Sequence, residues 1–197
     1  MPWPERFPDL TTPRLAMRET RDADVDVEYA MRTDLVVMRY WSSPPIQEIG
    51  EARDTVERAK GYFASRVGIR WIVTLRDDDR MMGSVALFSF HEQNRLAEVG
   101  YALAREHWGK GYMHEALVAA IDYAFGPLGL RRLEADTHPS NAASVKTLER
   151  LGFTREGFLR ERWQVGDEIS DSLVWGLLAR EWAARRTATG DAAARPR

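Results

Sequence analysis

The chain has 197 residues, of which 44% are hydrophobic and 29% are charged, and its 28 basic and 30 acidic side chains give a formal net charge of −2. These values are typical of one globular domain, and they argue against a protein whose main task is to neutralise nucleic-acid phosphates. The absence of cysteine excludes disulfides, thiolate metal sites and a cysteine acyl-enzyme.

No secretory signal is visible, and no apolar run approaches the roughly 20 residues of a membrane span. We therefore expect a cytoplasmic protein with no metal site and no binding to membranes or nucleic acid. Residues 1–13 contain four prolines, which predict an irregular arm. Residues 14–182 are expected to form the folded domain, and 183–197 a disordered tail.

Hydrophobic periodicity and turn residues predict the following elements. In chain order they are a strand at 14–18, helices at 22–33 and 48–66, strands at 70–75, 82–90 and 96–103, a helix at 111–125, a strand at 132–136, a helix at 141–151, a hairpin of strands 154–165 and 168–178, and a short helix at 180–186. Asn141 is a suitable N-cap, and Gly152 stands where a left-handed residue is favoured after a helix. The pattern indicates one mixed α/β domain.

The loop between the strand at 96–103 and the helix at 111–125 is the most informative segment. Gly109 and Gly111 flank Lys110 at a helix start, where unpaired backbone N–H groups carry partial positive charge. Because glycine lacks a Cβ atom, a pyrophosphate can approach this backbone closely. The segment matches neither a Walker A loop nor the dinucleotide G-x-G-x-x-G pattern. Taken alone, it is equally compatible with an ordinary glycine-containing loop.

Several motifs together resemble the GNAT acetyltransferases, especially the branch related to the ribosomal-protein N-terminal acetyltransferases RimJ and RimL. The motifs are Ala97-Glu98-Val99-Gly100-Tyr101-Ala102-Leu103, Trp108-Gly109-Lys110-Gly111-Tyr112, Glu115-Ala116, Asn141-Ala142-Ala143-Ser144 and Leu148-Glu149-Arg150-Leu151-Gly152-Phe153. The likeness extends from Thr12 to about Trp182. The family has Gln or Arg where this chain has Glu106, which makes Glu106 a poor phosphate ligand.

The resemblance implies a mostly antiparallel, mixed sheet of about six to seven strands, split in the middle and flanked by about four helices. It implies acetyl-CoA as the cofactor, lying in a split that begins near a bulge at Val99-Gly100. Backbone groups on the strand would pair with the pantetheine arm, and amides of the glycine loop would hold the pyrophosphate. The cofactor-binding residues so implied are Tyr101, Ala102, Leu103, Trp108, Gly109, Lys110, Gly111, Tyr112, Met113, His114 and Asn141.

Catalytic roles follow from the same resemblance. Ser144 is implied as the proton donor to the CoA sulfur, and the alternative is a small first-turn residue beside an Asn141 that only caps the helix. Glu98 is the leading general base, because it lies on the strand beside the expected split, and the alternative is a strand glutamate paired with an arginine. His91 and His138 are further candidates for the base.

The acceptor is expected to be a primary amine. An α-amine is about 10% neutral at pH 7, whereas a lysine amine is only about 0.04% neutral, so a site without a strong base favours a protein or peptide N-terminus. The alternatives are a small-molecule amine, such as a polyamine, amino acid or aminoglycoside, and a non-catalytic acyl-CoA-binding module. Four aromatic residues are expected to line the acceptor pocket, namely Trp41, Phe88, Phe90 and Trp163. We expect a monomer or a homodimer.

Overall fold

The computed structural model describes residues 2–188 and is built around one eight-stranded sheet. The strands lie in the order β1-β2-β3-β4-β5-β6-β8-β7, and each neighbouring pair is antiparallel except β5 with β6. Their bounds are β1 Leu10–Thr11, β2 Leu15–Arg18, β3 Gly68–Leu75, β4 Gly83–His91, β5 Leu96–Leu103, β6 Arg132–Thr137, β7 Thr154–Val165 and β8 Glu168–Leu178. The predicted mixed, mostly antiparallel sheet is confirmed, with one strand more than the upper expected number.

Six α-helices accompany the sheet in the described part of the chain. They are α1 Val25–Thr33, α2 Leu35–Met38, α3 Ile49–Tyr62, α4 Tyr112–Phe125, α5 Ala142–Leu151 and α6 Ala179–Ala188, with 3-10 turns at Asp22–Asp24 and Arg105–His107. The sequence did not predict α2, which is a single turn. It forms because the Asp34 carboxylate accepts the Val36 N–H at 2.9 Å and so caps it.

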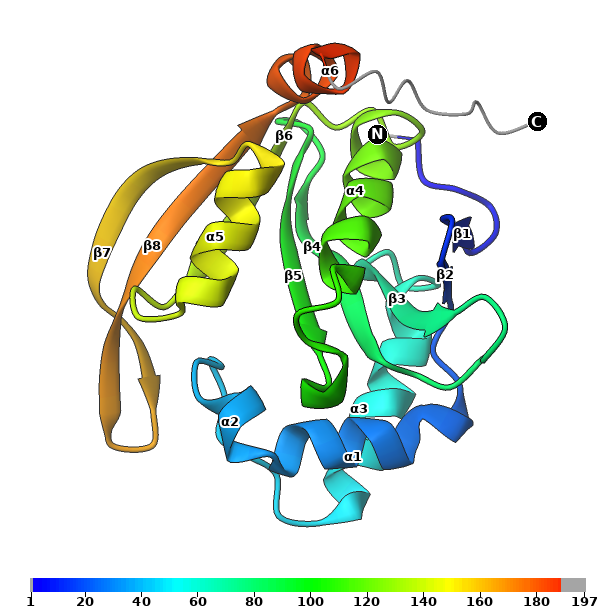
Figure 1. Ribbon diagram of the computed structural model, residues 1–197, viewed down its shortest axis with the longest axis vertical. Coiled ribbons are helices and arrows are strands. Elements are labelled where there is room, and N and C mark those ends of the chain that lie inside the picture. Colours follow the sequence, from blue (N-terminus) through cyan, green and yellow to red (C-terminus); the bar gives the residue numbers. More distant parts are fainter. Residues whose placement is uncertain (1, 189–197) are drawn as a thin grey trace.

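Different helices cover the two faces of the sheet. Alternating residues of a strand point to opposite faces, so Trp71 joins the main core with Leu117 of α4, whereas Ile72 packs with Met31 of α1. Figure 1 shows α4 and α5 side by side on one face, with α1 and α2 below the diverging ends of the strands. We call these the α4–α5 face and the α1–α2 face.

The sheet is split between β5 and β6. Only Leu96–Glu98 of β5 pairs with β6, at Arg132–Glu134, and the two strands diverge beyond these residues. The predicted split is therefore confirmed. The predicted bulge at Val99-Gly100 is wrong, because β5 stays in register with β4 there; the irregularity lies on β4, between Phe88 and His91. Ser89 has a φ of 52° at this bulge.

The two ends of the chain are more ordered than the composition suggests. Trp3 stacks on Phe63 at a centroid distance of 5.6 Å, so the expected irregular arm packs on the domain. At the other end α6 continues to Ala188, and its buried Trp182 donates to Asp122 at 2.7 Å. The expected disorder is therefore wrong for residues 183–188, while 189–197 lie outside the described residues. In the described part, no helix is long and apolar enough to cross a membrane.

Candidate active site

The glycine loop presents a run of free backbone donors. Gly109 and Gly111 adopt φ values of 74° and 78°, a left-handed conformation that favours glycine. The Trp108 N–H still bonds within the loop, and Glu115 N–H is the first to bond within the helix, to the Gly111 carbonyl at 3.1 Å. Between them, the six N–H groups from Gly109 to His114 have no acceptor among residues 2–188. Such a run at a helix start can hold a charged phosphate group.

The side chains of this loop contribute little by comparison. Lys110 is exposed, and Met113 packs against the main core. A Cβ atom at Gly109 would meet no atom within 4 Å, so the space over the loop is open to a ligand. Burial lowers the pKa of His114, and the nearby charge of Arg150 acts in the same direction. Neither Met113 nor His114 therefore brings a positive charge to an anion at neutral pH.

The outer half of β5 exposes an unpaired backbone edge toward the split. Ala104 N–H bonds to the Met82 carbonyl at 2.8 Å, and polar groups alternate along an antiparallel strand. The groups of Tyr101 and Leu103 therefore point away from β4 and into the split, whereas those of Ala102 point toward β4. The prediction that Ala102 pairs with the cofactor through its backbone is wrong. The Leu103 carbonyl is already bonded, because Trp108 Nε1 donates to it at 2.7 Å.

Ser144 and Tyr101 meet across the split on the α4–α5 face. The Tyr101 phenol oxygen lies 2.6 Å from Ser144 Oγ. Burial raises the pKa of Tyr101 to about 12, although its hydrogen bond with Ser144 acts in the opposite direction, so the phenol keeps its proton at neutral pH. Sequence reasoning assigned Tyr101 only a backbone role. Its alternation with Ala97 and Val99 was the available signal that its side chain faces the helices.

Asn141 forms the predicted cap of α5. Its Oδ1 accepts the Ser144 N–H at 3.1 Å. Its amide nitrogen has no hydrogen-bond partner among the described residues and is free to meet a ligand. The capping role is therefore confirmed, and it is compatible with a contact to the cofactor because the two roles use different atoms of one side chain.

Glu98 is a partly buried carboxylate on the opposite, α1–α2 face, where pairing between β5 and β6 ends. It has neither a hydrogen bond nor an ion pair in the described structure. The neighbouring arginine on β6, Arg132, is occupied, since its Nε donates to Glu134 at 2.7 Å and its other nitrogens to Glu156. The alternative of a structural arginine partner for Glu98 is therefore wrong.

The two histidine candidates are poorly placed as proton acceptors. His138 Nδ1 accepts the Ser140 N–H at 3.0 Å, and His91 Nδ1 accepts the Asn94 N–H at 3.3 Å. A neutral imidazole with an occupied Nδ1 carries its proton on Nε2. Each ring therefore has no free nitrogen lone pair for an incoming amine, which leaves Glu98 as the better base.

Phe90 is the acceptor residue that the structure contradicts. The bulge at Ser89 directs Phe90 to the aromatic cluster of the N-terminal arm, where its ring lies 5.4 Å from that of Trp3. Phe88 precedes the bulge and stays on the α1–α2 face. A Cβ atom at Gly100 would lie 3.0 Å from the Phe88 ring, so this glycine leaves room for the ring on the strand next to Glu98.

Trp41 and Trp163 lie on different elements, and each has an arginine over its ring. Trp41 follows α2, and the guanidinium of Arg32 lies over its ring at 5.3 Å. Trp163 of β7 donates its Nε1 to Asp136 Oδ1 at 3.1 Å, and Arg162 lies over its ring at 5.3 Å. Asp136 stands on β6 beyond the point where β5 and β6 part.

The loop after α2 also contacts the far side of the split. Tyr40 lies against His138, with ring centroids 5.0 Å apart, and so joins this loop to the end of β6. The sequence singled out neither Tyr40 nor Asp136, because their partners are distant along the chain.

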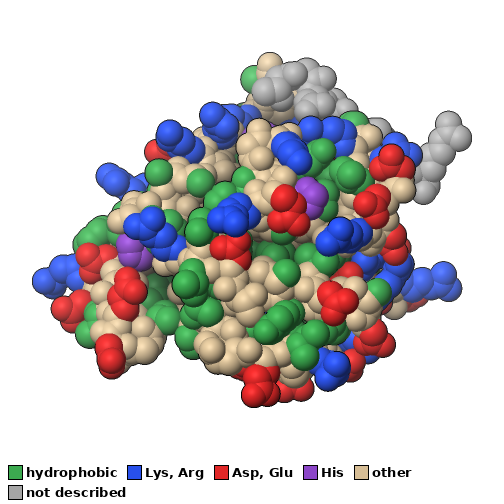
Figure 2. Space-filling model, turned by 60° about the horizontal axis from the view of Figure 1, so that its bottom comes forward, with side chains coloured by type: hydrophobic (Ala, Val, Ile, Leu, Met, Phe, Trp, Pro, Cys, Tyr) green, Lys and Arg blue, Asp and Glu red, His purple; other side chains and the backbone are tan. Residues whose placement is uncertain are grey.

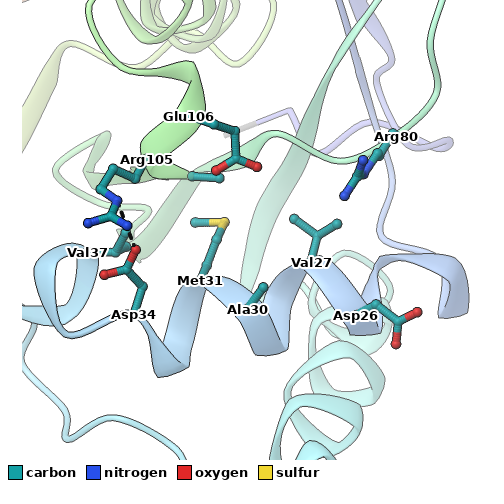
Figure 3. A pocket seen from close by; sticks show the side chains of 10 residues that line it. Asp26, Val27, Ala30, Met31, Asp34, Val37, Arg80, Arg105 and Glu106 are labelled. Carbon is teal, nitrogen blue, oxygen red and sulfur yellow. Dashed lines mark ion pairs between the residues drawn. The ribbon is translucent and has the colours of Figure 1, made fainter.

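A further cavity lies outside this constellation. It measures about 110 Å³ and is enclosed by α1, Arg80 and the turn at Arg105–His107 (Figure 3). Met31 and Val27 form its floor, and Asp34 pairs with Arg105 at 3.3 Å across one side. None of the predicted site residues lines it. The split beside β5, together with the glycine loop, is therefore the site that the chemistry indicates, and this cavity lies outside it.

Comparison with known proteins decides the family. The Acetyltransferase (GNAT) domain matches residues 14–154. The chain belongs to the GNAT acetyltransferases. It is 33% identical over 174 residues to the uncharacterized N-acetyltransferase p20 of Bacillus licheniformis, covering 88% of this chain and 98% of that protein. The predicted family is thus confirmed, and with it an N-acetyltransferase that uses acetyl-CoA.

Solved GNAT structures share the fold at low sequence identity. The spermidine N-acetyltransferase from Vibrio cholerae, in complex with CoA and spermine, superposes with a TM-score of 0.77 at 23% identity, covering 87% of this chain and 99% of that one. Mycobacterium smegmatis RimJ, in complex with CoA-disulfide, superposes with a TM-score of 0.78 at 21% identity, covering 90% of each chain. At this identity the likeness establishes the architecture and leaves the acceptor open.

Proposed function

We propose that this GNAT enzyme acetylates the α-amine of a protein or peptide N-terminus by direct attack. The observation that carries the proposal is that a possible proton donor and a possible proton acceptor lie beside the split, on opposite faces of the sheet. The Tyr101–Ser144 pair lies on the α4–α5 face, and the unpartnered Glu98 lies on the α1–α2 face. A donor and an acceptor of protons on either side of one gap suit acyl transfer to an amine.

Each group has a defined task. Bound acetyl-CoA supplies a thioester whose carbonyl is open to attack. Glu98 accepts the proton of the incoming amine, directly or through one water. The Ser144 hydroxyl donates to the sulfur that leaves. With Tyr101 as the donor of the hydrogen bond to Ser144 Oγ, the serine proton is directed away from Tyr101 and toward the leaving group.

The surroundings favour an N-terminal amine over a polyamine. Arginines occupy the faces of Trp41 and Trp163, where a polycation would otherwise stack. Asp136 Oδ1 accepts hydrogen bonds from Trp163 Nε1 and from the Ser172 hydroxyl. Figure 2 shows basic and acidic side chains interspersed over the end of the molecule that carries α1 and α2. The two stacked arginines therefore oppose the approach of a polycation to these tryptophans.

The proposal is tested with purified protein, acetyl-CoA and matched acceptors, with released thiol as the readout. The panel pairs short peptides bearing a free N-terminus with the same peptides blocked at the N-terminus, and adds spermidine and a free amino acid. We expect turnover with free N-termini and none with blocked ones. Turnover confined to spermidine would establish the polyamine alternative. CoA binding without thiol release on any acceptor would establish a binding module.

A further inference from the structure

A side chain from the start of β2, far from the glycine loop in sequence, is bonded to that loop. The Arg14 guanidinium donates its Nη1 to the Lys110 carbonyl at 3.0 Å. We propose that Arg14 is a positioning residue that fixes the backbone orientation of the glycine loop, so that the loop can bind the cofactor's pyrophosphate. This inference rests on the proposed assignment of the loop as the pyrophosphate site.

Arg14 is held in place from three directions. Its Nε donates to Glu115 Oε2 at 2.6 Å. Its guanidinium carbon lies over the Tyr112 ring, 4.7 Å from the ring centroid. Glu115 also accepts the Arg14 backbone N–H at 2.9 Å and the Thr12 hydroxyl at 2.5 Å. These hydrogen bonds lower the pKa of Glu115 although its burial acts to raise it, so the carboxylate stays charged. Arg14 is thus fixed relative to the first turn of α4.

The bond to Lys110 determines which way one peptide group faces. In a trans peptide the carbonyl and the following N–H point in opposite directions, and the described chain contains no cis peptide. Because the Lys110 carbonyl turns toward Arg14, the Gly111 N–H turns away from it. That N–H belongs to the run of six free donors. Arg14 therefore presents the Gly111 donor to the ligand.

The loop needs such a restraint. Gly109 and Gly111 both have positive φ values, and glycine occupies several backbone regions at similar energy. Without a fixed carbonyl, the Lys110–Gly111 peptide can rotate and turn its oxygen toward the phosphates. An oxygen in that place repels an anion, whereas the restrained loop offers a donor.

The competing role is a direct ion pair between Arg14 and a phosphate. Its Nη2 has no hydrogen bond among the described residues, and it would lie 3.4 Å from a Cβ atom at Gly111. The two roles differ in their response to salt. Salt screens a direct ion pair, so losing one reduces the salt dependence of binding, whereas losing a positioning bond leaves it unchanged. Both roles act only on ligands that carry phosphates.

The test uses the full chain and Arg14→Met, with CoA and 3′-dephospho-CoA titrated by calorimetry at several salt concentrations. We expect the Kd for both ligands to rise about tenfold, which corresponds to about 1.4 kcal/mol, with an unchanged salt dependence. The kcat/KM for acetyl-pantetheine, which lacks the pyrophosphate, should stay within about twofold of the wild type.

Two control variants separate positioning from a general loss of order. Arg131→Met removes an exposed arginine that also donates to a backbone carbonyl, that of Asn94 at 2.6 Å, at the other end of β5. Thr12→Val loosens the same Glu115 junction and leaves the bond from Arg14 to Lys110 in place. Both controls should bind CoA as the wild type does.

Unchanged CoA affinity in Arg14→Met would overturn the inference. So would a smaller salt dependence, which would assign a direct ion pair, or an equal loss with acetyl-pantetheine, which would assign general disruption. Absence of CoA binding by the wild type would refute the pyrophosphate site itself, and that outcome is distinguishable from the failure of Arg14 alone.

Discussion

Replacing Tyr101 by phenylalanine tests the proton-donor side of the proposed mechanism with the loss of a single oxygen atom. The phenol and the Ser144 hydroxyl are 2.6 Å apart, and both residues are partly buried. A neutral hydrogen bond of this kind contributes about 1 kcal/mol. Since about 1.4 kcal/mol corresponds to a tenfold change in rate, we expect Tyr101→Phe to lower kcat about fivefold.

The decisive result comes from combining two substitutions. If Tyr101 acts only by orienting Ser144, its loss has no further effect once the serine hydroxyl is gone. We therefore expect Tyr101→Phe to be nearly silent in a Ser144→Ala background, measured as thiol release at saturating acetyl-CoA. The KM for acetyl-CoA should stay within about twofold in both single variants, because neither removed oxygen belongs to the pyrophosphate loop.

A matched substitution controls for the loss of a buried phenol. Tyr123 is also partly buried, and burial raises its pKa, but its hydroxyl has no hydrogen bond among the described residues and its ring packs on Trp71 in the core. Tyr123→Phe should leave kcat unchanged. Fully additive effects of Tyr101→Phe and Ser144→Ala on kcat would refute the orienting role, as would an equal loss of turnover in the Tyr123 variant.

Three further predictions concern the base, the loop and pH. Glu98→Gln should lower kcat/KM for an N-terminal peptide about tenfold at pH 7, where about 10% of an α-amine is neutral, and the deficit should shrink above pH 8; a deficit that does not change with pH would contradict a proton-accepting role. Gly109→Ala places a side chain at φ 74°, and the control Gly129→Ala places one at φ 63°, so each should lower the free energy of unfolding by about 1 kcal/mol. Only the Gly109 variant should lose CoA affinity in a titration. Because burial raises the pKa of Tyr101 to about 12 from the usual 10, the folded state disfavours the phenolate, and stability present below pH 10 is lost as the pH rises through 12. Urea titrations between pH 10 and about 12 should show a smaller loss of folding stability in Tyr101→Phe than in the wild type. Equal losses in the two proteins would count against the role of the buried phenol.

Much of the sheet could be predicted because its strands carry local signals. The predicted bounds of β5, β7 and β8 agree with the structure to the residue, and the Gly166 turn marks where β7 ends and β8 begins. The glycine loop could also be predicted, because Gly109 and Gly111 stand directly before a helix and the whole pattern lies within a few residues. What local patterns could not give was α2, a four-residue helix that depends on one Asp34 cap.

The residues of the candidate site could be predicted where they lie close together in the sequence, but not where they come from distant segments. Asn141 and Ser144 belong to one helical turn, so their spacing was informative. Tyr101 reaches Ser144 from 43 residues away, and Arg14 reaches Lys110 from 96 residues away, so no local period reports either contact. Phe90 was misplaced because a single bulge reversed its direction, and strand alternation assumes that no residue is inserted.

The short pairing between β5 and β6 has a consequence for stability. Strands β1 to β5 follow one another as a continuous antiparallel sheet, and β6, β8 and β7 form a second panel joined to it by three residue pairs. The glycine loop belongs to the first panel, whereas Asn141 and Ser144 belong to the second. A ligand that contacts both panels therefore adds contacts where the two strands themselves supply none. At a hundredfold excess over its Kd, such a ligand adds about 2.7 kcal/mol to the stability of the folded enzyme.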